Sequence, residues 1–439
     1  MAERSTRGPE RLHPKTIGRF TSNRLLSGGA ILFLSSALVN VGNYAFNLVF
    51  GRWLGPEKFA DLTLIITLVL LTSFTTSTLG MISSRFSARA AASDDLAAIV
   101  QYRTWLGRIG WGAGITVSAV LVLGSKQLQS FFHTESFWPF VILGSTITLY
   151  FVQGVDRGVL QGRTLFGQLS LSYQAEMWTR LLLAVVLVGL GFGVSGTVGA
   201  IAASFVATWL VARRSTSGLP VEGRLSSEAR KEVMIFALPV LATLAGEILI
   251  NHSDILIVKR FFSSEDAGHY AALSLIGRVV FFASWPIAAV VFPLVTQRAH
   301  RNEPHRSLLF VSLGVVIAMG GSITLATAIA PEFVVRLLFG AKYLPVAPLL
   351  WLYAASTTLY TAANAIISYQ LALGKGLGSI MALLAGVAQV VLLWTFHDSL
   401  REMVLLQLEI MVVLTVAAVV WTAFTFAQGS DDRDLSSDL

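Results

Sequence analysis

Six ionisable residues lie inside long apolar stretches of the sequence, where a charged side chain needs a partner. They are Glu176, Arg180, Glu247, Asp254, Arg278 and Glu409. A charge at the centre of a bilayer costs about 2.5–3.5 kcal/mol on insertion scales, so it normally faces the interior of a helix bundle or a hydrated cavity. We therefore expect these residues to contact an anionic substrate, to carry a coupling ion, or to pair with one another.

Three of the apolar stretches carry several polar residues at helical spacing, so that each set lies on one face of a helix. The three sets are Asn40, Asn43 and Asn47; Glu247, Asn251 and Asp254; and Tyr353, Thr357, Tyr360, Asn364 and Ser368. Two interpretations stand side by side. Such faces either line a substrate cavity or form hydrogen bonds that hold the helices together.

The cavity interpretation assigns a role to each residue. Substrate binding is predicted for Arg278, Arg180, Asn43, Asn47, Asn251, Tyr360 and Asn364. Ion coupling or charge pairing is predicted for Glu247, Asp254 and Glu176, although Glu176 and Arg180 are four residues apart and could simply neutralise one another. Asp156 and Arg157, at a helix end, are expected to set topology rather than to contact a phosphate.

The composition indicates the medium in which these residues lie. Of the 439 residues, 54% are hydrophobic and only 13% are charged, against roughly 25% charged in a soluble domain. The chain is therefore expected to be a membrane protein without a sizeable soluble catalytic domain. Its net charge of +7 is interpreted as a topology signal, and no nucleic-acid partner is expected. Cysteine is absent, which excludes disulfides and thiolate sites.

Motifs for enzymatic chemistry are also absent from the sequence. It contains no P-loop, no H-E-x-x-H and no G-x-S-x-G, and its seven histidines do not cluster at metal-ligand spacing. The sequence therefore predicts no catalytic residue, no metal site, no cofactor and no enzyme activity. Proton or sodium coupling through the buried carboxylates stays open.

Charge-free runs long enough to span a bilayer, about 20 residues each, predict about twelve helices. The expected spans cover residues 25–50, 60–84, 105–125, 138–157 and 174–192, a sixth that ends near 212, and then 233–258, 269–293, 307–330, 346–373, 378–396 and 403–427. The predicted fold is an all-α polytopic membrane protein with two six-helix, pseudo-symmetric lobes around a central cavity.

The polar segments between the spans define the domain limits and the orientation. A basic tail (1–24) precedes the N-lobe (25–212), a linker (213–232) separates it from the C-lobe (233–427), and an acidic tail (428–439) follows. Most of the 32 Lys and Arg residues fall on the side of the two tails and the linker. The positive-inside rule then places both termini in the cytoplasm of a multi-pass protein of the plasma or inner membrane.

Weak self-similarity relates the two halves of the chain. A shift of 208 residues places Arg52-Trp53 on Arg260-Phe261, Asn43 on Asn251 and Glu57 on Glu265. An even number of helices in each half predicts lobes of the same orientation, related by an axis along the membrane normal. Two such lobes can rock against each other and open a central cavity to each side in turn, which is alternating access.

Three short motifs lie at the ends of predicted helices. The first is Phe50-Gly51-Arg52-Trp53-Leu54-Gly55-Pro56-Glu57-Lys58-Phe59. The second is Asp254-Ile255-Leu256-Ile257 with Ala267-Gly268-His269-Tyr270, and the third is Leu160-Gln161-Gly162-Arg163-Thr164-Leu165-Phe166. Together they resemble the polysaccharide and oligosaccharide-lipid flippases of the multidrug/oligosaccharidyl-lipid/polysaccharide exporter superfamily. Lipid II flippases of this superfamily typically carry two further helices, which the sequence does not show.

The resemblance implies a flippase that moves a polyprenyl-diphosphate-linked oligosaccharide from the cytoplasmic to the outer leaflet for surface polysaccharide assembly. Expected partners are this lipid-linked oligosaccharide, membrane lipids and, within the same assembly route, a polysaccharide polymerase and glycosyltransferases. Two alternatives stay open. One is a cation-coupled multidrug exporter of the same fold, and the other is a non-transporting membrane scaffold of a polysaccharide synthesis complex.

Overall fold

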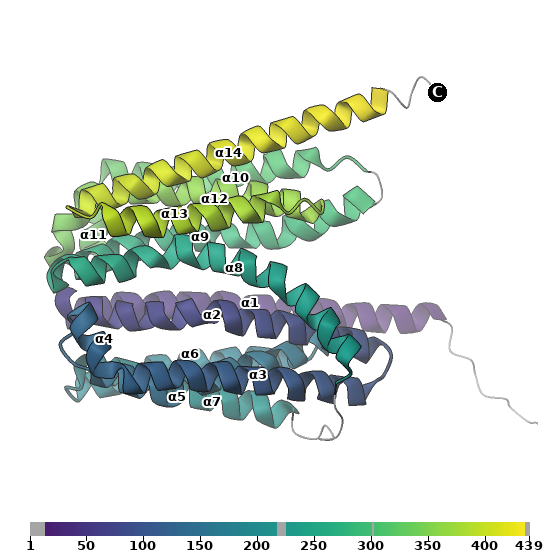
Figure 1. Cartoon of the computed structure of the whole chain (residues 1–439), viewed down its shortest axis with the longest axis horizontal. Coiled ribbons are helices and arrows are strands. Elements are labelled where there is room, and N and C mark those ends of the chain that lie inside the picture. The colour runs from purple at the N-terminus through teal and green to yellow at the C-terminus, as the bar shows by residue number, and fades with distance from the viewer. Residues whose placement is uncertain (1–13, 217–224, 301–302, 435–439) are drawn as a thin grey trace, which may run out of the picture.

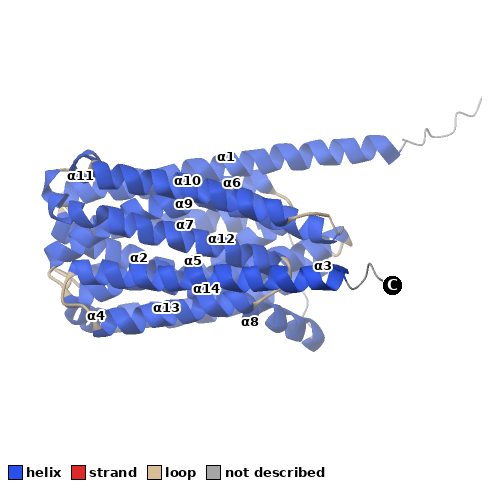
Figure 2. Cartoon of the chain, turned by 90° about the horizontal axis from the view of Figure 1, so that it is seen from above, coloured by secondary structure: helices blue, strands red, loops and turns tan. Residues whose placement is uncertain are grey.

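The computed structural model describes residues 14–216, 225–300 and 303–434. Parts of both tails and of the linker expected at 213–232 therefore lie outside the described residues. Within them the chain is helical, without a strand (Figure 2). In chain order the elements are α1 (Pro14–Leu54), α2 (Pro56–Ala92), α3 (Leu96–Leu123), α4 (Ser125–Phe132), α5 (Trp138–Gly162), α6 (Phe166–Gly189), α7 (Gly193–Thr216), α8 (Ser227–Phe261), α9 (Ser264–His300), α10 (Arg306–Ile329), α11 (Pro331–Leu338), the 3₁₀ helix η1 (Ala341–Leu349), α12 (Leu350–Ala372), α13 (Leu377–Thr395) and α14 (Leu400–Asp434).

Each of the twelve predicted spans coincides with one long helix, which confirms the all-α polytopic fold class. Nine helices in the described part of the chain are long and apolar enough to cross a membrane by length and composition. The sequence did not predict the short elements α4, α11 and η1, because runs of eight or nine residues are too short to span a bilayer. Figure 1 shows α4 and α11 at the same end of the bundle, opposite the start of α1 and the end of α14.

The two halves of the chain repeat the same pattern of helix packing. In the N-lobe (α1–α7), α1 packs on α6, α2 on α5, α3 on α5, and α6 on α7. In the C-lobe (α8–α14), α8 packs on α13, α9 on α12, α10 on α12, and α13 on α14. Each of these four contacts in the N-lobe thus has its counterpart seven helices later, and the short helices α4 and α11 correspond as well. The pseudo-symmetry expected from the sequence is therefore present in the packing.

The two lobes lie one above the other in Figure 1, and α8 runs obliquely between them. The second half of α8 belongs to the C-lobe, where Gln389 of α13 donates a hydrogen bond to the Ile250 carbonyl oxygen (2.8 Å). Its first half packs instead on the N-lobe, with Val233 and Ala237 buried against Phe86 of α2 and its neighbours. α8 thus ties the lobes together along one side.

A glycine stripe on α5 sets the close approach of this helix to α2. Gly154, Gly158 and Gly162 recur every fourth residue, and a Cβ atom at any of them would lie within 3 Å of α2 atoms. At Gly158 the Cβ would be 2.4 Å from the carbonyl oxygen of Gly80, which is backbone and cannot rotate away. Small residues at such spacing let helix backbones approach closely in membranes, where no hydrophobic effect drives the helices together.

Gly158→Ala is expected to lower the free energy of unfolding by about 1–3 kcal/mol, because overpacking forces α2 and α5 apart. Gly112→Ala is the matched control, since nothing lies within 4 Å of a Cβ on this α3 glycine. The measurement is the monodisperse fraction that remains after heating in detergent. Equal thermal stability of the two variants would show that the glycine stripe does not set the α2–α5 distance.

Candidate functional site

A cluster of charged side chains lies inside the N-lobe, where α1, α5 and α6 meet. Glu176 of α6 accepts hydrogen bonds from two arginines: Arg157 of α5 at 2.8 Å and Arg180, one turn along α6, at 2.5 Å. Arg180 also donates to the side-chain oxygen of Asn43 on α1, at 3.3 Å. All three charged side chains are at least four-fifths buried. The structure thus brings together three predicted site residues and adds Arg157.

Arg157 was expected to set topology, and the structure gives it a place in this cluster. Its guanidinium also donates to the hydroxyl and carbonyl oxygens of Ser172 (3.1 and 3.0 Å) and lies 4.2 Å from the ring centroid of Tyr173. Its neighbour Asp156 is buried separately and pairs with Arg103 of α3 at 2.6 Å. The sequence placed Arg157 at a helix end, whereas α5 continues to Gly162.

The N-lobe cluster carries more positive than negative charge. Two guanidinium groups share one carboxylate, so one positive charge has no acidic partner within the cluster. The Nε of Arg180 is also buried without a hydrogen-bond acceptor among the described residues. Buried donors are normally satisfied, so the cluster has the charge and the spare donor to bind an anionic group.

The C-lobe holds a different cluster, centred on Asp254 of α8. One oxygen of its carboxylate, Oδ2, accepts hydrogen bonds from the hydroxyls of Tyr270 on α9 (2.9 Å) and Tyr353 on α12 (3.0 Å). Gln407 of α14 in turn donates to the Tyr270 hydroxyl at 2.8 Å. The other oxygen, Oδ1, is buried and has no donor among the described residues. This oxygen is therefore able to accept a proton or to bind a small cation.

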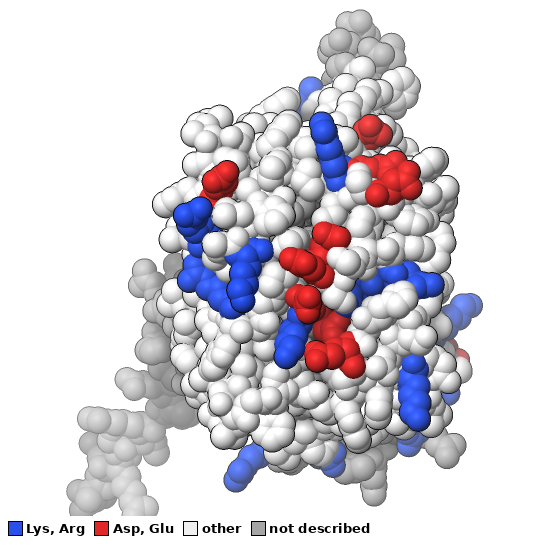
Figure 3. Space-filling model, turned by 90° about the vertical axis from the view of Figure 1, so that its left-hand side faces the viewer, with Lys and Arg blue, Asp and Glu red and all other residues white. Residues whose placement is uncertain are grey.

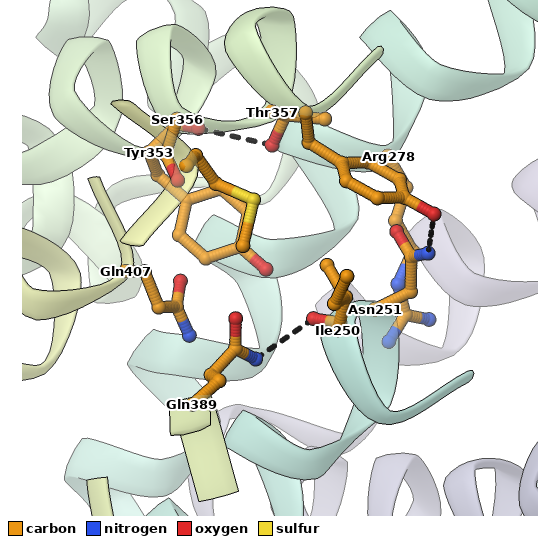
Figure 4. A pocket seen from close by; sticks show the side chains of 10 residues that line it. Ile250, Asn251, Arg278, Tyr353, Ser356, Thr357, Gln389 and Gln407 are labelled. Atoms are coloured by element: carbon orange, nitrogen blue, oxygen red, sulfur yellow. Dashed lines mark hydrogen bonds between the residues drawn. The ribbon is translucent and has the colours of Figure 1, made fainter. Parts of the chain in front are cut away.

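A cavity of about 30 Å³ lies among α8, α9, α12, α13 and α14 (Figure 4), and it shares Tyr353 and Gln407 with the hydrogen-bond network of Asp254. It is lined by Ile250, Asn251, Arg278, Tyr353, Ser356, Thr357, Tyr360, Gln389, Gln407 and Met411. This volume is enough for roughly two water molecules. Polar side chains from five helices therefore converge on a space that can be hydrated.

Two of the predicted residues meet across this cavity. The Asn251 amide on α8 donates to the Tyr360 hydroxyl on α12 at 3.1 Å. Arg278 of α9 also lines the cavity, and its guanidinium lies 3.3 Å from the Nδ1 of His252. The Nε of Arg278 is buried without an acceptor among the described residues. Arg278 therefore has a donor to offer a ligand, as Arg180 has in the N-lobe.

The other predicted residues lie outside these hydrogen-bond networks. Asn47 donates to the carbonyl oxygen of Asn43 in its own helix (2.8 Å). Glu247 and Asn364 are half-buried on α8 and α12, one turn from Asn251 and Tyr360 respectively. Glu409, one of the six ionisable residues noted in the sequence, is exposed near the start of α14. The polar stripes thus divide between hydrogen-bonded clusters and positions beside them.

The seam between the lobes is closed at the end that carries α4 and α11. There Lys259 of α8 and Asp61 of α2 form an ion pair at 2.7 Å that joins the lobes. Tyr343 of η1 donates to the Gly51 carbonyl oxygen of α1 at 2.6 Å. Figure 3 views this end and shows acidic side chains in a band across its middle, with basic side chains on both sides. The sequence had not singled out Asp61 or Lys259.

Comparison with known proteins places the chain in a family and a fold. Residues 49–348 match the model of the family described as polysaccharide biosynthesis protein. No curated protein matches the sequence. The chain also resembles solved MATE transporter structures, at identities so low that the likeness shows the fold alone.

Three of these solved structures are similar to this chain to different degrees. An inward-facing multidrug resistance MATE family transporter of the MOP superfamily has a TM-score of 0.76 and 15% identity, over 89% of this chain and 95% of that chain. An outward-facing conformation has a TM-score of 0.61 and 17% identity, over 92% of this chain and 95% of that chain. A MATE in a straight conformation has a TM-score of 0.65 and 12% identity, over 92% of this chain and 96% of that chain. The family match over more than half of the sequence shows that the chain belongs to the polysaccharide biosynthesis protein family, in the fold of the MATE transporters.

Proposed function

We propose that this protein is a flippase that moves a polyprenyl-diphosphate-linked oligosaccharide from the cytoplasmic to the outer leaflet for surface polysaccharide assembly. The observation that carries the proposal is the excess positive charge of the buried N-lobe cluster, where Arg157 and Arg180 share Glu176. Arginine is well suited to phosphate because its planar guanidinium forms paired, charge-assisted hydrogen bonds. Membership of a polysaccharide biosynthesis family supports a sugar-linked substrate.

In this proposal the two lobes contact different parts of the substrate. The cationic N-lobe cluster, with Arg278 from the C-lobe, attracts the diphosphate, while the amide and hydroxyl groups of Asn251 and Tyr360 contact the sugar. The polyprenyl chain stays in the bilayer, so the protein has to shelter only the polar head. Lobes that open to each side in turn then carry that head across.

The orientation follows the distribution of basic residues along the chain. The start of α1 and the end of α14 lie at the same end of the bundle (Figure 1). We place that end in the cytoplasm of the plasma or inner membrane, because the expected loops on that side hold most of the Lys and Arg residues. The α4–α11 end, where the seam is closed, then faces outward, and the structure corresponds to a state that is closed to the outside.

Coupling to an ion gradient is assigned to the C-lobe. Asp254 has an unpartnered Oδ1, and two tyrosine hydroxyls hold its other oxygen in place. One of these tyrosines, Tyr353, lines the small polar cavity. A proton or a sodium ion bound there changes the charge of the cavity that holds Arg278. Ion binding and substrate release are then linked through electrostatics.

A cation-coupled multidrug exporter is the second candidate, because the solved structures of this fold include multidrug resistance transporters. Cells that lack the protein discriminate between the two functions. Accumulated lipid-linked oligosaccharide with loss of surface polysaccharide supports the flippase. Drug sensitivity with unchanged surface sugar supports the exporter.

Arg180→Gln is expected to reduce surface polysaccharide in complemented cells and to raise the pool of lipid-linked oligosaccharide. The variant leaves the Arg157–Glu176 pair intact, so the lobe still folds. Loss of one charge-assisted hydrogen bond from Arg180 to the diphosphate costs about 1.5–3 kcal/mol. This cost corresponds to a transport rate that is lower by about ten- to a hundredfold. Arg108→Gln, an exposed arginine on α3, is the control. Normal export by a folded Arg180→Gln protein would contradict the role of the cluster.

Asp254→Asn is expected to abolish the response of transport to an imposed ion gradient. The amide keeps the size of the side chain but can neither release a proton nor offer a negative charge to sodium. The measurement is transport in proteoliposomes under separate proton and sodium gradients, which also identifies the ion. Glu409→Gln, at an exposed carboxylate, should respond as the unmodified protein does. A gradient response that survives in Asp254→Asn would remove Asp254 from coupling.

A further inference from the structure

The ion pair between Asp61 and Lys259 is almost completely withdrawn from water. The two side chains are 8% and 1% exposed, and their charged atoms are 2.7 Å apart. Lys259 also donates to the Ser264 hydroxyl at 3.1 Å, and the second oxygen of Asp61 accepts the backbone N–H of Glu135 at 3.1 Å. The pair is therefore held from both lobes in a fixed geometry.

The same two helices form another ion pair at the opposite end of the bundle, in a different setting. Arg89 of α2 and Glu232 of α8 are 2.8 Å apart, but their side chains are 72% and 48% exposed. Exposed pairs of this kind contribute little, because both groups are hydrated whether or not they touch. The two pairs therefore differ in burial, while the helices that they join are the same.

Further close contacts join the lobes at the same end as the buried pair. The Cβ of any residue other than glycine at position 268 would lie 2.0 Å from the Pro56 carbonyl oxygen, so the starts of α9 and α2 are in direct backbone contact. The Arg52 guanidinium donates to backbone carbonyl oxygens at the end of α11, Leu337 and Leu338 among them. All of these contacts cross between the lobes at the α4–α11 end.

Burial makes the pair sensitive to the loss of either partner. Removing one member of a buried pair leaves a charge without compensation, whereas replacing both members with uncharged groups is often tolerated. A pocket of about 300 Å³, lined by Lys58, Asp61, Glu135 and residues 191–195, reaches the Asp61 side of the pair. Lys259, whose side chain is only 1% exposed, does not line this pocket. Without its partner, Lys259 regains full hydration only if the lobes part, and a lone Asp61 gains more water by the same movement.

We infer that Asp61 and Lys259 form the lock that holds the lobes together at the α4–α11 end, and that separating this pair opens the protein at that end. The assignment of this end to the outside rests on the proposed orientation, whereas the lock rests on the contacts between the lobes. In each transport cycle both charges then have to be hydrated once. The strength of the pair therefore determines how readily the closed state opens at the α4–α11 end.

The test measures the distance between spin labels placed on Glu57→Cys and Glu265→Cys. These residues are exposed, start α2 and α9, and lie on opposite sides of the seam. The natural chain has no cysteine, so labels attach only to the introduced positions. Pulsed electron paramagnetic resonance on the purified full chain, without substrate, gives the ratio of short to long distances.

Asp61→Asn and Lys259→Met are each expected to shift this ratio toward the long distance by about tenfold or more, because each leaves one buried charge unpaired. The double variant is expected to return to the short distance, since no charge then remains to be hydrated. Arg89→Gln and Glu232→Gln, at the exposed pair, should leave the ratio unchanged.

Two results would overturn the lock: single variants that keep the short distance, or a double variant as open as the single ones. If the single variants fail to fold, the charge-swapped protein Asp61→Lys with Lys259→Asp carries the test. It should show the short distance, and an open seam in that protein would contradict the inference. The distance is measured without transport, so this test of the lock is independent of the proposed substrate.

Discussion

A charge inside an apolar helix bundle has to find a partner or water, and the arrangement of this protein follows from that constraint. Three of the buried carboxylates meet it in three different ways. Asp61 has a lysine from the other lobe, Glu176 has two arginines, and Asp254 has two tyrosine hydroxyls and one free oxygen. The first arrangement is neutral, the second has excess positive charge, and the third can gain a proton or a cation. These differences suit a gate, an anion-binding site and a coupling site respectively.

The duplicated packing explains how these sites can act on one another. Each lobe is built from the same helix contacts, with α5 and α12 in equivalent central places. Packed interiors such as the glycine contact between α2 and α5 resist deformation, so each lobe is expected to move as a body. The contacts that must break are then those of the seam. α8 contacts both lobes and limits how they can separate.

Much of the fold was predictable from the sequence, because spanning helices follow from apolar length alone. Parts of the candidate site were predictable as well, since the periodicity of α8 placed Asn251 and Asp254 on one face. Periodicity does not identify the partner, however, so the Asn251–Tyr360 hydrogen bond and the place of Arg157 beside Glu176 needed the structure. The Asp61–Lys259 pair was missed for a similar reason. Each residue lies close to a helix end, where a charge is ordinarily exposed, and only the packing of the two lobes buries both.

We propose that the protein itself moves a diphosphate-linked sugar lipid across the bilayer. The most direct measurement uses the purified full chain in proteoliposomes that contain a polyprenyl-diphosphate oligosaccharide with a labelled sugar. A glycosidase added outside reports how fast sugars from the inner leaflet become accessible. We expect accessibility to rise beyond the outer-leaflet fraction with intact protein, and to stay at that fraction in protein-free vesicles. Equal accessibility in both preparations, with correctly inserted and folded protein, would contradict the flippase account.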